Sequence, residues 1–361
     1  MSSLEDSGVE SALRDGLAPR LGGPVAGFAV DRRIVRRYSQ VMFCRLDVGA
    51  AEPLRCVAKV VTGPADNMAR QQVLMARDFR VNTHLHATLP RPDLFAVPAP
   101  LLFRPDLNLI VTAFEPGVRL QDRLIAAGRG WPSAATLAAL EEDCRACGGW
   151  VRAFQASTAS LIDADPAFAA GLDSIDAGTS VDQVAICLEK LGLAGDSPFS
   201  PAQERMLLDF VAERARRIDG ADARVAGVHG DCFAGNVLRD GPRTVGIDFV
   251  MFRRGIRLVD PAYFVLQLET LRLIPGFRQA TVRRLVHAFV QGYDPALDAD
   301  RFWTGSPAAQ VLYVLHRVRR LWGMSGGRVP LHRALMRRLQ FVWTARSLLA
   351  FTRQQAAGAT A

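Results

Sequence analysis

Three side chains with oxygen ligands stand close together in the stretch 225–249. Asp231 comes first, Asn236 follows five residues later, and Asp248 comes at the end of the next apolar run. Such a set suits phosphoryl transfer, because the protein's main tasks there are to position a hydroxyl and to neutralise phosphate charge. Asp231 can accept the hydrogen of an attacking hydroxyl. Asn236 and Asp248 can supply hard oxygen ligands to Mg²⁺, which takes few ligands from the protein.

The residues around this set predict strand, loop, strand, turn and strand. The first predicted strand is the apolar run 225–228, which precedes the loop, and the second is 237–238, which follows it. A tight turn is predicted over 239–242, and the third strand, 244–247, ends at Asp248. This order brings the three side chains to one end of the strands. Asp, Asn and Gly are common in any turn, so ordinary turn residues are the alternative. Asn occurs at only four positions in the chain and His at six, which favours the chemical interpretation.

At these residues the chain resembles the aminoglycoside phosphotransferase and choline kinase superfamily, whose signature is His-Gly-Asp, four residues, Asn, and then a strand ending in Ile-Asp-Phe. The resemblance implies an α+β, two-lobed, protein-kinase-like fold. A small antiparallel-sheet N-lobe would precede a larger, mainly helical C-lobe. It also implies ATP or GTP and Mg²⁺ as cofactors. The roles that it implies are catalytic base for Asp231 and metal ligand for Asn236 and Asp248.

Lys59 lies inside the predicted strand 54–61, where a lysine is costly unless it is paired or faces a cleft. Only two of the 44 lysines and arginines are lysines, which makes this one informative. The resemblance implies that Lys59 holds the α- and β-phosphates of the nucleotide. The alternative is an edge-strand lysine with its ammonium group in water.

The predicted helix 67–89 carries Asp78, our candidate for the carboxylate that pairs with Lys59 in the resembled family. That family usually has Glu at this place. Because Asp is shorter, a solvated Asp on the helix surface is the alternative.

The segments 26–30, 34–38, 41–48 and 54–61 predict an antiparallel sheet with turns at Asp31-Arg32 and at Tyr38 to Val41. Protein kinases have a glycine-rich turn over the phosphates at the second of these places, and this chain has no glycine there. Ser39, with Gln40, could still offer a hydroxyl and backbone N–H groups to phosphate.

The segment 113–117 changes composition abruptly after the predicted strands 101–103 and 109–112. By resemblance it is the hinge, whose backbone hydrogen-bonds the adenine, so Glu115 is a candidate nucleotide-binding residue. We therefore predict an N-lobe over 1–113 and a C-lobe over 114–361. A simple loop is the alternative.

The C-terminal part predicts helices over about 119–127, 134–158, 180–191, 202–218, 260–271, 276–292, 306–323 and 329–354. Gln155 replaces a histidine that is structural in the resembled family. Asp260, followed by Pro261, is predicted to cap its helix. The last two helices carry Arg317, Arg319, Arg320, Arg328, Arg333, Arg337 and Arg338. A solvated basic face and an anion-facing groove are the two interpretations.

The composition, with 49% hydrophobic and 22% charged residues, is typical of a globular protein. We expect a cytoplasmic protein, because the start lacks a signal-peptide pattern and no apolar run reaches a membrane span. The six scattered cysteines indicate buried free thiols. The net charge of +8 comes without a nucleic-acid recognition motif, so nucleic acid is not an expected partner. Nothing indicates an oligomeric state.

We predict an ATP-dependent phosphotransferase that moves the γ-phosphoryl group to a hydroxyl of a small molecule. The arginine-rich C-terminal region favours a sugar-like or anionic acceptor over an aminoglycoside. The alternative from another class is a non-catalytic, nucleotide-binding pseudokinase or regulatory module. A protein kinase is opposed by His-Gly-Asp in place of His-Arg-Asp and by the lack of recognisable activation-segment motifs.

Overall fold

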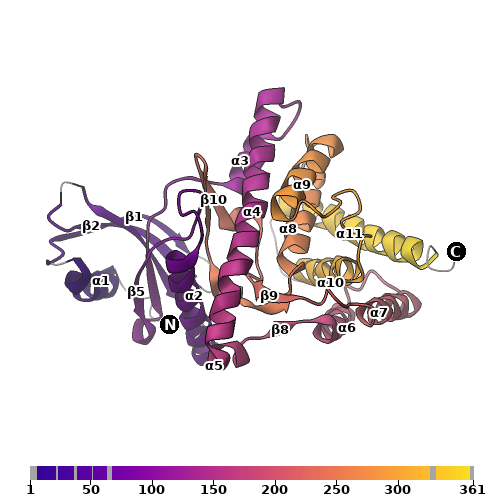
Figure 1. Cartoon of the computed structure of the whole chain (residues 1–361), viewed down its shortest axis with the longest axis horizontal. Coiled ribbons are helices and arrows are strands. Elements are labelled where there is room, and N and C mark those ends of the chain that lie inside the picture. The colour runs from indigo at the N-terminus through magenta and orange to yellow at the C-terminus, as the bar shows by residue number, and fades with distance from the viewer. Residues whose placement is uncertain are drawn as a thin grey trace. The chain divides into compact units, whose positions relative to one another are not determined.

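The computed structural model of the chain describes residues 6–21, 23–35, 39–50, 52–62, 67–325 and 331–357. By its internal contacts the chain forms two compact units (Figure 1). Unit 1 consists of Met1–Val118 and Asn236–Phe252, and unit 2 consists of Arg119–Gly235 and Arg253–Ala361. The lobe boundary between residues 113 and 114 stays a prediction.

Unit 1 contains an antiparallel sheet with the strand order β1-β2-β3-β6-β5. Alternating burial along β3 places Cys56, Ala58 and Val60 on one face, where they pack with apolar residues of helix α1. Val61, on the other face, packs with Met75 of helix α2. The bounds are α1 Asp6–Leu21, β1 Gly27–Val35, β2 Ser39–Asp47, β3 Leu54–Val61, α2 Met68–Thr88, β5 Pro100–Arg104 and β6 Leu109–Ala113.

Strand β1 corrects the prediction of two strands with a turn at Asp31-Arg32, because it runs unbroken from Gly27 to Val35. The register shifts between Val30 and Arg32, so a β-bulge takes up the extra residue and the strand continues. The predicted turn 38–41 was also wrong, since Ser39 to Val41 pair with β3 as residues of β2. Tyr38 lies outside the described residues.

The segment that returns to unit 1 forms the hairpin of β10 (Val237–Asp240) and β11 (Arg243–Gly246). The sheet order is β4-β11-β10-β7, with β4 at Phe95–Ala96 and β7 at Val118–Arg119. Short 3-10 turns complete the region at Pro105–Leu107 (η2), Ala234–Asn236 (η3) and Phe249–Met251 (η4). The strands predicted around the three oxygen ligands are therefore confirmed.

Unit 2 is mainly helical, and α4 packs along α9 (Figure 1). The two helices approach closely because Gly148 faces backbone of α9 and Gly292 faces backbone of α4, and a Cβ at either position would collide. The helices are α3 Leu120–Ala127, α4 Ala134–Ala164, α5 Pro166–Ala170, α6 Ala177–Leu193, α7 Pro201–Ala215, α8 Val259–Glu269, α9 Gln279–Tyr293, α10 Pro307–Met324 and α11 Leu331–Ala357. A small sheet has the order β8-β12-β9, with β8 Ser174–Ile175, β9 Val225–Val228 and β12 Arg253–Ile256, and η5 spans Thr270–Leu273.

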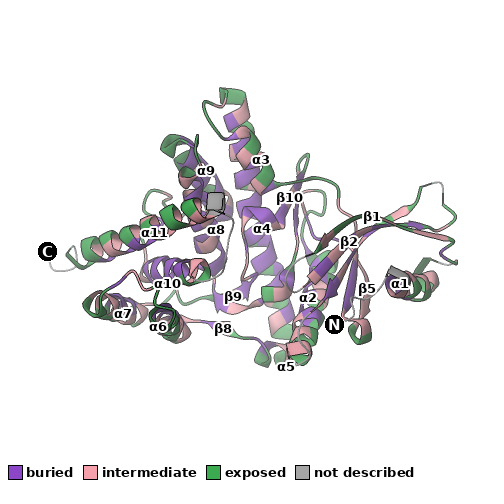
Figure 2. Cartoon of the chain, turned by 180° about the vertical axis from the view of Figure 1, so that it is seen from behind, coloured by how far each residue is buried: buried purple, intermediate pink, exposed green. Residues whose placement is uncertain are grey.

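The core of unit 2 is built from the buried residues of α4, α8, α9 and α10, whereas α11 keeps an exposed side (Figure 2). The predicted helices of this region are confirmed over the described residues, and α4 extends six residues beyond its predicted end, to Ala164. The predicted start of the last helix, 329–330, lies outside the described residues. All six cysteines are free and buried, as predicted. Over the part of the chain that the structure describes, no helix is long and apolar enough to cross a membrane.

Candidate active site

Lys59 of unit 1 projects from the face of β3 opposite the α1 core, because it alternates with Ala58 and Val60. Its ammonium nitrogen Nζ lies 2.7 Å from Oδ1 of Asp248 and 3.6 Å from Oδ2 of Asp78. The lysine side chain is 22% exposed and that of Asp78 is 10% exposed, whereas Asp248 keeps 40% exposure. The structure therefore brings together three residues that the sequence predicted for nucleotide and metal binding.

Burial and ion pairing act in opposite directions on the pKa of Lys59. Burial would lower it, but the carboxylates of Asp248 and Asp78 outweigh burial and raise it above its usual value. Lys59 is therefore a cation at neutral pH. With one ammonium group and two carboxylates, the cluster is rich in negative charge, which suits a further cation.

The segment after β11 is held by α2 at both ends. Asp78 Oδ1 accepts a hydrogen bond of 3.0 Å from the backbone N–H of Phe249. Arg77, the neighbouring residue on α2, donates from Nη1 to the carbonyl of Phe252 at 3.0 Å. Asp248 itself takes a left-handed conformation with φ of 71°. Asp78 thus pairs with Lys59 and also fixes the backbone next to Asp248.

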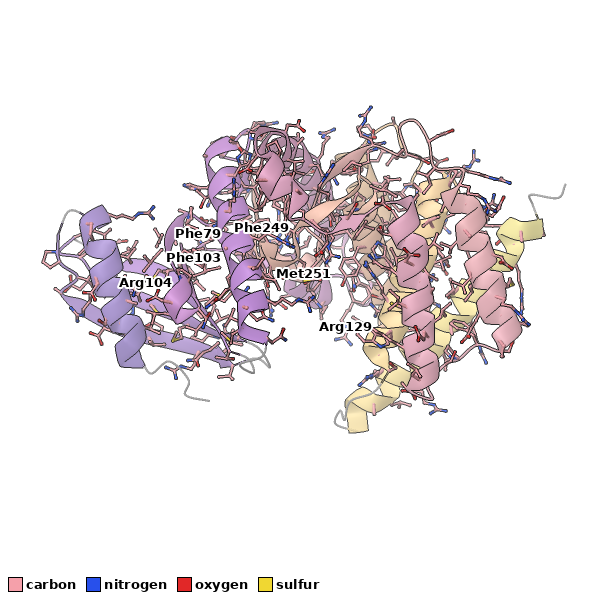
Figure 3. The ribbon with its side chains drawn as sticks, turned by 90° about the horizontal axis from the view of Figure 1, so that it is seen from below. Phe79, Phe103, Arg104, Arg129, Phe249 and Met251 are labelled. Carbon is pink, nitrogen blue, oxygen red and sulfur yellow. The ribbon has the colours of Figure 1, made fainter. Side chains whose placement is uncertain are left out.

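Aromatic packing supports the same part of α2. Figure 3 labels Phe79 of α2 and Phe103 of β5, whose rings stack with centroids 5.5 Å apart. Both residues pack on the apolar cluster of Val61, Met75 and Ile110. Because Phe79 follows Asp78 directly, this contact fixes the helix turn from which the carboxylate projects.

The hairpin register brings Asn236 and Asp248 to one end of β10 and β11. Val237 pairs with Gly246, and the backbone N–H of Ile247 donates to the carbonyl of Asn236 at 3.1 Å. Among the described residues no group of three or more His, Cys, Asp or Glu side chains could hold a metal. A carboxamide and a carboxylate nevertheless fit Mg²⁺, which usually takes one or two carboxylates and fills its other positions with phosphate and water.

In unit 2, the segment before Asp231 is held by Asp260 of α8. The carboxylate of Asp260 accepts hydrogen bonds from the backbone N–H groups of His229 (2.7 Å) and Gly230 (3.0 Å). Gly230 has a φ of 80°, which a residue with a Cβ rarely adopts. Burial raises the pKa of Asp260 despite these bonds and the nearby His229.

The prediction that Asp260 caps its own helix was wrong. Helix α8 already begins at Val259, and no side chain caps it. The carboxylate instead turns to the two backbone N–H groups of a segment that is distant in the sequence. Asp and Pro favour a helix start for local reasons, and the sequence pattern does not reveal a distant partner.

Asp231 lies beside the hydroxyl of Tyr263, also on α8. Burial raises the pKa of Tyr263 to about 12, and the charge of Asp231 and a hydrogen bond to it add to the rise. The ring of Phe233 contacts that of Tyr263 edge-on, with centroids 6.5 Å apart. Upstream, His229 is buried against the rings of Trp150 and Phe154, with centroids 6.3 and 6.0 Å from its own. Aromatic packing thus flanks the loop around Asp231.

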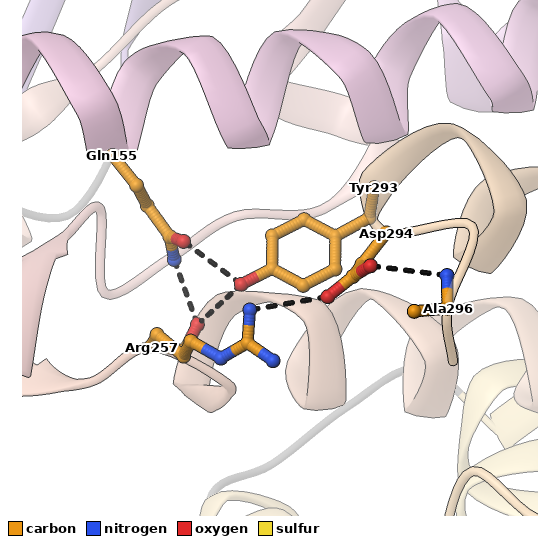
Figure 4. Close-up of polar contacts among 5 residues, drawn as sticks. All are labelled: Gln155, Arg257, Tyr293, Asp294 and Ala296. Carbon is orange, nitrogen blue, oxygen red and sulfur yellow. Dashed lines mark hydrogen bonds and ion pairs between the residues drawn. The ribbon is translucent and has the colours of Figure 1, made fainter. Parts of the chain in front are cut away.

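Gln155 has a structural position in unit 2 (Figure 4). Its Nε2 donates to the carbonyl of Arg257 at 2.7 Å, and its Oε1 accepts from the hydroxyl of Tyr293 at 2.9 Å. The guanidinium of Arg257 pairs with Asp294 at 3.2 Å. The carboxamide provides a donor and an acceptor at once, which is what a buried histidine at this place would also supply.

Two further candidates lie in unit 1. Ser39 opens β2 opposite Val61 and is half-buried. The carboxylate of Glu115 is occupied by an ion pair with Arg243. Their nucleotide-binding roles stay predictions, and a role for Glu115 would fall to its backbone.

Sequence reasoning missed Arg77, the role of Asp260, and Tyr263. Arg77 stands next to Asp78 in a helix that the sequence predicted, and a buried arginine is unusual. Tyr263 is three residues after Asp260, so the two lie on one face of α8, and this spacing could have drawn attention to it.

Comparison with known proteins supports the predicted relationship. Residues 46–303 match the phosphotransferase enzyme family. An amicoumacin kinase in complex with AMP-PNP, Ca²⁺ and Ami has a similar structure, with a TM-score of 0.59, 13% identity and coverage of 96% of this chain and 94% of that one. A comparison with curated proteins gave no significant match.

Two more solved structures have the same fold. The apoenzyme of a macrolide 2′-phosphotransferase from Brachybacterium faecium gives a TM-score of 0.51 at 17% identity, covering 94% of this chain and 97% of that one. A thermostable mutant of an aminoglycoside phosphotransferase, in a ternary complex with ADP and hygromycin B, gives a TM-score of 0.53 at 15% identity, covering 95% of this chain and 98% of that one. The predicted α+β, kinase-like fold with an antiparallel-sheet N-lobe and a mainly helical remainder is confirmed.

Proposed function

The chain belongs to the phosphotransferase enzyme family, and from this premise we propose that it transfers the γ-phosphoryl group of ATP to a hydroxyl of a small molecule. The observation that carries the proposal is the contact of Lys59 with both Asp248 and Asp78. A half-buried lysine held between two carboxylates has a fixed position and a permanent charge, which phosphate binding requires.

Lys59 would bind the α- and β-phosphates of the nucleotide, and Asp78 would hold the lysine in place. Asn236 and Asp248 would hold Mg²⁺, which neutralises phosphate charge when bound. ATP rather than GTP is favoured because similar structures contain AMP-PNP or ADP.

Asp231 would accept the proton of the attacking hydroxyl. Asp260 would keep it in position, because it fixes the two peptide N–H groups directly before Asp231. The hydroxyl of Tyr263 beside Asp231 stays protonated at neutral pH, since its pKa is about 12, and it can therefore donate a hydrogen bond to the carboxylate.

For the acceptor, we propose a sugar-like or anionic hydroxy compound rather than an aminoglycoside. The net charge of +8 and the arginines after residue 300 support this, because guanidinium groups attract oxyanions and disfavour polycations. Kanamycin-like polyamines should therefore be poor substrates.

The test is ADP release by the purified protein with Mg-ATP and a library of hydroxy metabolites that includes aminoglycosides. We expect at least one neutral or anionic compound to stimulate ADP release and Asp231→Asn to abolish the stimulation. Binding of Mg-ATP without turnover of any compound would favour the pseudokinase alternative. Turnover of an aminoglycoside with a low-micromolar KM would contradict the acceptor assignment.

A further inference from the structure

Helices α8 and α10 of unit 2 face each other beside Asp231. Tyr263 and Gln267 lie four residues apart on α8, and His316 and Arg320 lie four residues apart on α10, so each pair shares one helix face. The rings of Tyr263 and His316 contact each other with centroids 5.4 Å apart. Nη1 of Arg320 donates to Oε1 of Gln267 at 3.3 Å.

Arg319 precedes Arg320 and belongs to the same surroundings. Its charge interacts with the hydroxyl of Tyr263 and with the guanidinium of Arg253 on β12. Tyr263 in turn touches Asp231 through its hydroxyl. Tyr263 is therefore a neighbour of the carboxylate that we assign to proton transfer and also of the two arginines.

These two arginines differ from their neighbour Arg317, which pairs with Glu269 at 2.7 Å. Among the described residues, no carboxylate lies within ion-pair distance of Arg319 or Arg320. Within the described ranges, the hydrogen bonds of Arg320 go to the neutral side chains of Gln267 and Gln340. Both arginines are half-buried, so the interpretation as a simple solvated face does not fit them.

The electrostatic cost of this arrangement lowers the pKa of both guanidinium groups. Burial, followed by repulsion from Arg253, lowers the pKa of Arg319 to about 10. Burial also lowers the pKa of Arg320. Half-buried charges without counter-charges are unfavourable, and an anion bound between them would remove the cost.

We propose that Arg319 and Arg320 bind an oxyanion of the acceptor, so that the acceptor is a hydroxy compound with a phosphate or a carboxylate group. The arginines hold the anionic end, and the reacting hydroxyl lies toward Tyr263 and Asp231. This inference rests on the proposed function and adds to it the residues that select the acceptor. Of the arginines in the C-terminal region, Arg328 and the side chain of Arg333 lie outside the described residues.

A binding experiment tests the arginines without requiring turnover. The nucleotide site is first saturated with Mg²⁺ and AMP-PNP, and sodium sulfate is then titrated against NaCl of equal ionic strength while the thermal midpoint is measured. Sulfate stabilises proteins generally, so the matched variant Arg346→Gln, an exposed arginine of α11, supplies the baseline.

We expect sulfate to raise the midpoint of the wild type and of Arg346→Gln equally, and to raise that of Arg319→Gln less. In the absence of sulfate, Arg319→Gln should be no less stable than the wild type, because the change relieves repulsion from Arg253. Equal sulfate shifts in all three proteins would overturn the inference.

Steady-state kinetics identify the anion. The panel pairs each neutral compound with its charged forms: glucose with glucose 6-phosphate and gluconate, and glycerol with glycerol 3-phosphate and glycerate. We expect a charged member to have a kcat/KM at least about tenfold above its neutral parent, and Arg319→Gln to raise its KM about 10- to 100-fold. Arg319→Lys should recover part of this loss, since it restores charge but not the forked donor.

The two proposals can fail separately. Acceptor-independent ATP hydrolysis and the thermal shift caused by Mg-ATP report on the proposed function alone, and loss of both would overturn it. If both are present while neutral acceptors outperform their charged forms in the wild type and in Arg319→Gln, the anionic-acceptor inference is wrong and the proposed function stands.

Discussion

Two clusters of charged side chains, one in each unit, have opposite charge balances. The metal-side cluster of unit 1 (Lys59, Asp78 and Asp248) sets one ammonium group against two carboxylates. The acceptor-side cluster of unit 2 (Asp231, Tyr263, Arg319 and Arg320) sets two guanidinium groups against one carboxylate. Each imbalance predicts the charge of the ligand that completes the cluster: a divalent cation in the first and an anion in the second.

The way in which the clusters are held also differs. In the metal-side cluster, Asp78 pairs with the lysine and also accepts the N–H of Phe249, so charge and backbone are fixed by one side chain. In unit 2 these tasks are divided. Asp260 fixes the backbone before Asp231, while the arginines of α10 supply the charge. In unit 2, a substitution can therefore change the position of the Asp231 segment without changing the arginines, or the reverse. In unit 1, a substitution of Asp78 changes the charge beside Lys59 and the hydrogen bond to Phe249 together.

The largest expected effect comes from Asp231→Asn, which removes the single carboxylate of the acceptor-side cluster. We expect kcat to fall by about 10²–10⁴, the usual loss on removing a general base. The thermal stabilisation by Mg-ATP should be unchanged, because the metal-side cluster is intact. Asp240→Asn, the same change at an exposed position on β10, is the control. A variant that keeps most of its kcat would remove Asp231 from the base role.

Asp248→Ala tests the metal-side cluster, where we expect loss of Mg-ATP binding. The change leaves one carboxylate for Lys59 and removes the proposed metal ligand, so Mg-ATP should no longer stabilise the protein. For the wild type at 100 times its Kd, this stabilisation would be about 2.7 kcal/mol. It is measured by thermal unfolding with and without Mg-ATP. Equal stabilisation of Asp248→Ala and the wild type would contradict the metal assignment.

Asp260→Ala separates positioning from charge. The change leaves the N–H groups of His229 and Gly230 without their partner, so the free energy of unfolding should fall by about 1–3 kcal/mol. Stabilisation by Mg-ATP should persist, in contrast to Asp248→Ala. Denaturant unfolding measures both quantities, and Asp260→Asn, which keeps one acceptor oxygen, should lose less. Unchanged stability in both variants would mean that the two hydrogen bonds contribute little.

The last expected effect is a pH dependence of stability and concerns His316, whose ring contacts Tyr263 and whose Nε2 lies 3.1 Å from the carbonyl of Val259. Burial, with repulsion from Arg319, Arg317 and Arg253, lowers its pKa to about 3.

Between pH 6.5 and pH 3, the unfolded chain therefore binds a proton at His316 that the folded chain does not. His316 thus contributes stability above pH 6.5 that is lost as the pH falls toward 3, by up to about 1.4 kcal/mol per pH unit. His316→Gln should flatten the fall of stability by that slope, as measured by urea unfolding across this range. Identical slopes in variant and wild type would show that the ring is protonated in the folded state, and that the arginines near it do not act as described.

The sequence by itself determined the parts of this protein that depend on neighbours in the chain. The spacing of Asn236 and Asp248 within strands and tight turns was enough to predict their shared hairpin end, because β10 and β11 pair locally. The position of Lys59 within an apolar strand indicated a paired lysine for the same reason: alternation along β3 is a local property.

Only the tertiary structure decided which side chains meet across distance. It paired Asp78 with Lys59 although Asp is shorter than the expected Glu, and it turned Asp260 from its own helix to the backbone of His229 and Gly230. It also placed no carboxylate of the described residues beside Arg319, which a count of arginines could not have predicted. These outcomes depend on how helices pack against strands and against each other, and packing places residues together that have no fixed separation in the sequence.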